Sequence, residues 1–231
     1  MNEKPAIWFV TGTDTEIGKT FCAAALARGL VRQGRRVGVY KPVASGCVPD
    51  ANGDLVAEDA VQLWDAAGRP GSLQAVCPQR FRTPLAPPQA AARESRVVDA
   101  AGLVDNARTW LSGDVDVVVV EGAGGLFSPI AGGMLNVDLL KQLAPARVWL
   151  VAPNRLGVIS AVVANVRAAV ASNVRVSDLI LNQIPNTDDA SMDSNAHEIG
   201  HWLSLESGAT PRVHSMPVNG TGEFFLPDLK P

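Results

Sequence analysis

A run of nine residues near the N-terminus has the composition of a phosphate-binding loop. The run Gly12-Thr13-Asp14-Thr15-Glu16-Ile17-Gly18-Lys19-Thr20 follows a short apolar segment and precedes a long helical pattern. In such a loop, backbone N–H groups and the helix N-terminus bind phosphate oxygens, the lysine reaches the β- and γ-phosphates, and the hydroxyl binds Mg²⁺. Gly12 stands one residue before the first glycine of the usual G-x-x-x-x-G-K-[ST] pattern, where this chain has Thr13. Because strand, loop and helix signals occur in the right order, we predict a nucleoside triphosphate site rather than a chance Gly-Lys-Thr.

Two acidic residues are candidates for the metal that accompanies such a nucleotide. Glu121 ends the apolar run Val117–Val120, and an acidic residue at that place holds Mg²⁺ in P-loop proteins. A helix cap or a solvated carboxylate is the alternative for Glu121. Asp59 lies at the start of a predicted helix, where acidic residues are common because they favour the helix dipole. Composition alone therefore makes Asp59 more often a helix-start acid than a metal ligand.

Lys41 follows a second apolar segment and precedes the stretch Pro42-Val43-Ala44-Ser45-Gly46. A lysine beside a phosphate loop can neutralise the charge of a phosphoryl group in transfer. A solvated surface lysine is the other interpretation, and the residues alone favour neither.

Short Val- and Ile-rich runs alternate with longer segments of helical period. We predict strands at Ile7–Thr11, Val37–Tyr40, Val115–Val120, Val148–Ala152, Leu179–Leu181 and Arg212–His214. We predict helices at Lys19–Arg32, Glu58–Ala67, Ala100–Leu111, Val137–Leu143, Val158–Ala171 and Met192–Ser204. The stretch Pro84–Pro88 is expected to be a loop, and Pro217–Pro231 is expected to wrap the surface. This alternation is typical of an α/β fold of P-loop NTPase type, a mostly parallel sheet with helices on both faces.

The polar residues that could do chemistry follow the ends of predicted strands. These positions are Gly12–Asp14, Lys41, Glu121–Gly124, Asn154 and Asn182-Gln183. In open parallel sheets ligands bind beyond the C-terminal ends of the strands, so one rim would collect all of these groups. Glycines after Glu121 would let the backbone approach a ligand closely.

Length and charge exclude several other classes of protein. The chain has 231 residues, 47% hydrophobic and 19% charged, so a single domain spanning residues 1–231 is expected. A net charge of −3 provides no electrostatic footprint for nucleic acid or anionic lipid. No segment approaches the length of a membrane span, and we expect no membrane contact. Three cysteines without C-x-x-C spacing indicate a reducing, cytoplasmic compartment, with Cys22 packed in the core.

Taken together, these segments resemble the dethiobiotin synthetase family. The resemblance is carried by Phe9–Thr20, Tyr40–Gly46, Glu58-Asp59-Ala60, Phe81 with Pro84-Leu85-Ala86-Pro87 and Ala90-Ala91, Val120–Gly125, and Leu156-Gly157. It covers about the first 160 residues well and the remainder loosely. It implies a homodimeric ligase of biotin synthesis that closes a cyclic urea on 7,8-diaminononanoate, using CO₂, ATP and Mg²⁺.

The resemblance also implies roles for individual residues. Lys41, Lys19 and Thr15 would be catalytic, and Thr20, Asp59 and Glu121 would hold Mg²⁺. The diamine or its carbamate would contact Thr15, Lys41 and Ser45, with its carboxylate near Leu156 and Gly157 of the partner subunit. Nucleotide contacts would come from Gly12, Thr13, Glu16, Ile17, Gly18, Lys19, Thr20, Phe21, Glu121, Gly122, Ala123, Gly124, Asn182, Gln183 and Pro217, with Asn182 facing the adenine.

Three other functions share parts of this pattern. A partitioning or division ATPase would carry a second lysine five residues before Lys19, where this chain has Asp14. Such ATPases also often end in a basic amphipathic helix, which the C-terminal segment lacks. A related ligase acting on another small amine and a nucleotide-binding module without catalysis are the remaining alternatives.

Overall fold

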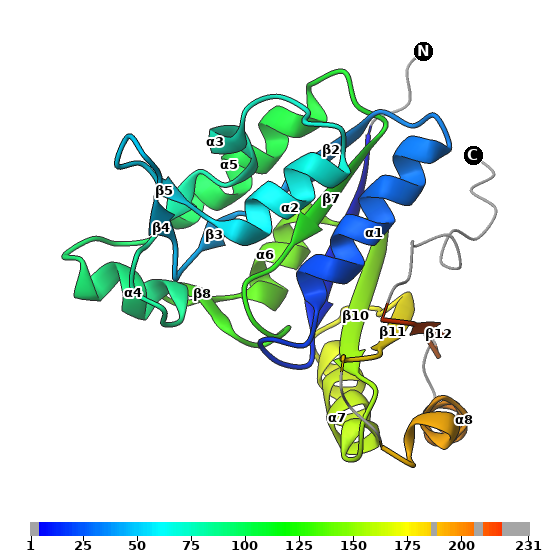
Figure 1. Ribbon diagram of the computed structural model, residues 1–231. Coiled ribbons are helices and arrows are strands. Elements are labelled where there is room, and N and C mark those ends of the chain that lie inside the picture. Colours follow the sequence, from blue (N-terminus) through cyan, green and yellow to red (C-terminus); the bar gives the residue numbers. More distant parts are fainter. Residues whose placement is uncertain (1–4, 186–188, 206–209, 219–231) are drawn as a thin grey trace.

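A six-stranded sheet forms the centre of the molecule (Figure 1), in a computed structural model that describes residues 5–185, 189–205 and 210–218. Its strands are β1 (Ala6–Gly12), β2 (Val37–Tyr40), β7 (Val117–Glu121), β10 (Arg147–Pro153), β11 (Asp178–Asn182) and β12 (Arg212–Met216). The strand order is β12-β11-β10-β1-β7-β2, and every neighbouring pair is parallel. The predicted P-loop type of α/β fold is confirmed.

Helices cover both faces of this sheet because its strands are apolar on both sides. Along β1, Trp8 and Val10 face a core shared with α1 (Lys19–Arg32) and α2 (Glu58–Ala66). Ile7 and Phe9 face the opposite core. That second core includes α5 (Ala100–Leu111), α6 (Asn136–Leu143), α7 (Val158–Ala171) and α8 (Met192–Ser204).

The long helices lie where their periodicity predicts, whereas several short elements escape prediction. The unpredicted elements are the helices α3 (Leu73–Val76) and α4 (Pro87–Arg93), with three small two-stranded sheets. These sheets pair β3 (Val43–Ala44) with β6 (Gln79–Arg80), β4 (Val48–Pro49) with β5 (Leu55–Val56), and β8 (Pro129–Ala131) with β9 (Met134–Leu135). Strands of two or three residues are too short to show a period.

One loop prediction is wrong in part. The stretch Pro84–Pro88 was expected to be irregular, but α4 begins at Pro87. Proline fits the first turn of a helix because its missing N–H would have no partner there. Most of the segment Pro217–Pro231, predicted to wrap the surface, lies outside the described residues, which end at Val218.

Because neighbouring strands are parallel, their C-terminal ends lie side by side at one edge of the sheet, where the site is built. Val10 of β1 is opposite Glu121 of β7, and Tyr40 of β2 is opposite Val120. The residues that follow β1 and β2 therefore lie beside Glu121. Among the described residues, no helix is long and apolar enough to cross a bilayer. The three cysteines are all described, free and buried, and Cys22 packs in the core as predicted.

Candidate active site

The phosphate loop connects β1 directly to α1. Gly18 precedes the first residue of α1 with φ of 84°, a left-handed conformation that favours glycine. The side-chain amide of Asn182 donates a hydrogen bond to the carbonyl oxygen of Ile17 at 3.0 Å, and a Cβ on Gly18 would collide with that amide. The Lys19 ammonium donates to the carbonyl oxygen of Asp14 at 2.6 Å. The left-handed turn at Gly18 and the bond to Asp14 therefore hold the Lys19 side chain folded back over the phosphate loop.

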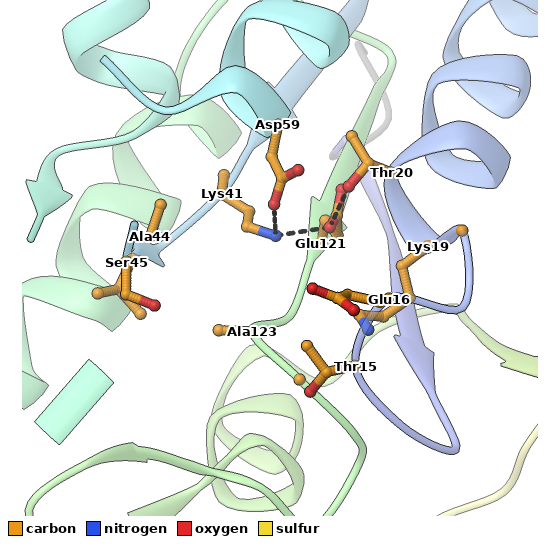
Figure 2. Close-up of a pocket in the computed structure, with 13 residues that line it drawn as sticks. Thr15, Glu16, Lys19, Thr20, Lys41, Ala44, Ser45, Asp59, Glu121 and Ala123 are labelled. Carbon is orange, nitrogen blue, oxygen red and sulfur yellow. Dashed lines mark hydrogen bonds and ion pairs between the residues drawn. The ribbon is translucent and has the colours of Figure 1, made fainter. Parts of the chain in front are cut away.

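Lys41 is buried between two carboxylates, which excludes the surface-lysine interpretation. Its Nζ lies 2.6 Å from Glu121 Oε1 and 2.8 Å from Asp59 Oδ2 (Figure 2). The Thr20 hydroxyl donates to the same Glu121 oxygen at 2.9 Å. The Lys41 and Glu121 side chains are 4% and 1% exposed, whereas that of Asp59 is 44% exposed. Four residues from four segments of the chain therefore meet at one point.

Burial and charge act in opposite directions on these groups. Burial by itself would lower the pKa of Lys41, but Glu121 and Asp59 outweigh burial and raise it. Burial raises the pKa of Glu121 against the opposing effect of Lys41. The pKa of Asp59 is lowered because Lys41 and Thr20 overcome its desolvation. Desolvation lowers the pKa of Lys19, although Glu121 opposes this. Lys41 is thus a fixed cation at physiological pH.

A cavity of about 400 Å³ opens beside this cluster. Thirteen residues line it: Thr15, Glu16, Gly18, Lys19, Thr20, Lys41, Val43, Ala44, Ser45, Asp59, Glu121, Ala123 and Gly124. Ser45 lies on one side of the cavity, whereas Thr15 and Lys19 lie on the side of the phosphate loop (Figure 2). A cavity lined by two lysines, three hydroxyls and three carboxylates can bind a polyphosphate together with a small polar substrate.

The oxygen atoms near Thr20 have the chemistry that Mg²⁺ prefers. A hydroxyl and two carboxylates are hard donors, and Mg²⁺ usually takes one or two carboxylates along with phosphates and water. Glu121 Oε2 is buried and has no hydrogen-bond partner among the described residues, so this oxygen is available as a metal ligand. Among the described residues, no three His, Cys, Asp or Glu side chains are placed so that they alone could hold a metal ion.

Several sequence-predicted residues lie outside the lining of the cavity. Gly12, Ile17 and Gly122 are buried behind it, and Thr13 and Phe21 flank the loop and the first turn of α1. A Cβ on Gly12 would lie 2.6 Å from Ile17 Cδ1, so only glycine fits there without displacement.

The residues predicted to contact the base lie together at the ends of β11 and β12. Gln183 donates its backbone N–H to the carbonyl oxygen of Met216, next to Pro217, at 2.8 Å. Asn182 Oδ1 is buried without a hydrogen-bond partner among the described residues. Leu156 and Gly157 are exposed before α7 and are not among the lining residues, and the Leu156 N–H donates to the Asp189 carboxylate at 2.7 Å.

Sequence reasoning missed one buried polar residue of this region. Asn136 begins α6, is fully buried, and bonds to the loop that follows Glu121. Its only sequence signal is that of a polar residue at a helix start. Val43 and Ala44 were also missed as lining residues, because a two-residue strand of small apolar side chains resembles any core segment.

Comparison with known proteins decides the family. A family model described as an AAA domain matches residues 7–216. The ATP-dependent dethiobiotin synthetase of Rhodopirellula baltica is 46% identical over 92% of this chain and 86% of its own length. The chain belongs to the dethiobiotin synthetase family. The synthetase of Phenylobacterium zucineum is 34% identical over 92% of this chain and 89% of its own length. Membership in this family makes the chain an enzyme, an ATP-dependent ligase, as the sequence predicts.

Similarity to solved structures supports the fold of this family member. The signal recognition particle receptor FtsY of Elizabethkingia anophelis has a TM-score of 0.53 at 18% identity. The alignment covers 97% of this chain, which spans 62% of the FtsY chain. The structure of pNOB8 ParA bound to nonspecific DNA has a TM-score of 0.53 at 13% identity, over 88% of this chain and 77% of the ParA chain. These similarities extend to the P-loop NTPase architecture.

Proposed function

We propose that this enzyme closes the cyclic urea of dethiobiotin from 7,8-diaminononanoate and CO₂, with ATP as the energy source. The observation that carries the proposal is Lys41, held between Glu121 and Asp59 at the wall of a cavity that also contains the phosphate loop. A cation fixed between the nucleotide and a second substrate suits phosphoryl transfer to that substrate. Family membership supplies the substrates that fit this arrangement.

The proposed reaction has three steps. One amine of the diamine attacks CO₂ and loses a proton, which gives a carbamate. A carbamate oxygen then attacks the γ-phosphorus of ATP, ADP leaves, and a carbamic-phosphoric anhydride forms. The second amine attacks the carbonyl carbon of the anhydride, loses a proton and displaces phosphate, which closes the ring. Each step needs charge stabilisation and positioning rather than an enzyme nucleophile.

The lining residues divide between the two substrates. Lys19, Thr20, Gly18 and Glu16 would bind the nucleotide phosphates, and Lys41 would stabilise the charge shared by the carbamate and the transferring phosphoryl group. Thr15 and Ser45 would contact the diamine or its carbamate.

The metal and the base have their own proposed contacts. Mg²⁺ would be held by Thr20, Asp59 and Glu121, and when bound it neutralises phosphate charge. Asn182, Gln183 and Pro217 would contact the base, and the unpartnered Asn182 oxygen suits the amino group of adenine.

The proposal includes a homodimer in the cytoplasm. Leu156, a residue that is 80% exposed, and Gly157 would approach the diamine bound to the partner subunit. A single exposed leucine is ordinary on a protein surface, so the proposed dimer rests on the family resemblance. Three free, buried thiols suit a reducing compartment.

Phosphate release from ATP tests the proposed reaction directly. The assay contains Mg²⁺, ATP, bicarbonate and 7,8-diaminononanoate, and each component is omitted in turn. Release should require both the diamine and the CO₂ source, and a new product with the mass of the cyclic urea should accumulate. Equal release without the diamine would identify a free-running ATPase and overturn the proposal. Light scattering at assay concentration tests the dimer.

A further inference from the structure

The loop after β7 forms one wall of the cavity, and the side chain of Asn136 makes several hydrogen bonds to its backbone. Gly122–Ser128 leaves the sheet after Glu121, and its residues Ala123 and Gly124 line the cavity. Asn136, at the start of α6, is fully buried behind this loop. Asn136 itself is not a lining residue of the cavity.

The amide of Asn136 pairs with the loop backbone as a neighbouring strand would. Its Nδ2 donates to the carbonyl oxygens of Ala123 at 2.6 Å and Gly125 at 2.9 Å, with Ser128 as a longer third partner at 3.2 Å. Its Oδ1 accepts the N–H of Ala123 at 3.1 Å. Both backbone polar groups of Ala123 are therefore satisfied by one side chain. Only a primary amide can accept and donate twice in this way, so no other group of the same size replaces it.

The same amide leaves no room for a side chain at Gly122, the residue before Ala123. A Cβ on Gly122 would lie 2.7 Å from Asn136 Oδ1, closer than real Cβ contacts. Glycine at this position thus lets the amide reach the loop.

The loop is also fastened to the phosphate loop and faces the second substrate's side of the cavity. The Leu126 N–H donates to the carbonyl oxygen of Gly12 at 2.9 Å. A Cβ on Gly124 would lie 3.8 Å from the Thr15 hydroxyl, so this part of the wall is next to Thr15. Figure 2 shows Ala123 and Thr15 on the same cavity.

We infer that Asn136 is a positioning residue that fixes the Ala123–Gly124 wall against the diamine or its carbamate. The inference rests on the proposed function for the identity of that substrate. The family resemblance implies nucleotide contacts for Ala123 and Gly124, whereas the position of Gly124 next to Thr15 favours the diamine. Loss of Asn136, which acts through this wall, should therefore affect diamine binding more than nucleotide binding, for which the loop before α1 and Lys19 remain in place.

Asn136→Ser removes the amide without burying a charge, and Leu139→Ala is the matched control. Leu139 is a fully buried residue of the same helix, so its truncation loosens α6 while leaving the amide in place. Gly122→Ala is a second variant, which displaces the amide from the other side should the serine variant fold poorly.

Two measurements are made on the full-length parent and variants. Each protein is measured at the same interval below its own melting temperature. Hydrogen exchange of the 122–128 segment, without substrates, should accelerate about tenfold in Asn136→Ser and Gly122→Ala, as expected for loss of one net hydrogen bond. It should change less than about threefold in Leu139→Ala. The KM for 7,8-diaminononanoate should rise about tenfold in both loop variants, while ATP affinity stays within about threefold.

Each outcome decides the inference. Unchanged exchange in both loop variants, or equal acceleration in Leu139→Ala, would show that Asn136 does not hold the wall. Faster exchange with an unchanged diamine KM, or with an equal loss of ATP affinity, would show that the wall does not serve the diamine. If the parent enzyme fails to use the diamine at all, the proposed function fails, and the exchange measurement still decides whether Asn136 holds the loop.

Discussion

Replacing Lys41 by methionine should separate turnover from nucleotide binding. Methionine retains much of the volume of the lysine stem and removes its charge. The ammonium lies 2.6 Å from Glu121 and 2.8 Å from Asp59, at the wall of the cavity and not within the phosphate loop. Charge stabilisation that matters mainly in the transition state affects kcat rather than ground-state affinity.

The size of the effect follows from the burial of Lys41. Removal of one preorganised charge donor costs about 10²- to 10³-fold in kcat, or about 2.7–4 kcal/mol. The same change leaves the Glu121 carboxylate, whose side chain is 1% exposed, without its cation. Breaking a buried pair in this way costs about 3–5 kcal/mol of stability. At about 2–4 °C per kcal/mol for a chain of this size, the melting temperature should fall by about 6–20 °C.

Calorimetric ATP affinity is compared with single-turnover phosphate release, below the melting temperatures of all variants. Lys19→Met is the matched control, because Lys19 is also a buried lysine at this cavity but lies in the phosphate loop. Lys41→Met should keep ATP affinity within about threefold and lose turnover, whereas Lys19→Met should lose both. Turnover of Lys41→Met within about threefold of the parent would refute the assignment. So would a loss of ATP affinity as large as that of Lys19→Met.

Three further predictions concern the loop, the acid stability and the thiols. Gly12→Ala should weaken ATP binding several-fold in calorimetry, because the new Cβ would displace Ile17 under the phosphate loop, and unchanged affinity would contradict this steric argument. The backbone N–H groups of Thr83 and Arg82 donate hydrogen bonds to the Glu94 carboxylate and lower the pKa of Glu94. The ionised carboxylate therefore stabilises the fold above about pH 4.3, the usual pKa of glutamate. This stabilisation is lost as the pH falls through the lowered pKa of Glu94. Urea unfolding should therefore show Glu94→Gln less stable than the parent at pH 7, with a difference that shrinks as the pH is lowered below about 4.3. The three buried cysteines should resist a thiol reagent in the native protein and react in urea, since burial raises their pKa values, in one case to about 12.

The sequence by itself determined the order and type of the long elements. The bounds of α1, α5, α7 and α8 coincide with their predicted ranges, because helices of 12 to 14 residues show several turns of apolar period. The rule that ligands bind beyond the C-terminal ends of parallel strands placed Lys41 and Glu121 on one rim before any contact was known. Both residues do meet there.

The tertiary structure decided the environment of each of these groups. Lys41 could have been a solvated lysine, and Asp59 a helix-start acid, since neither composition nor spacing reports burial. Asp59 is in fact both a residue of the first turn of α2 and a partner of Lys41, because the packing of α2 against α1 brings that turn to the rim. Asn136 carried no signal beyond a polar residue at a helix start. Its four bonds to the loop after β7 exist only because β8 and β9 return the chain to that loop, a contact between segments that no local pattern encodes.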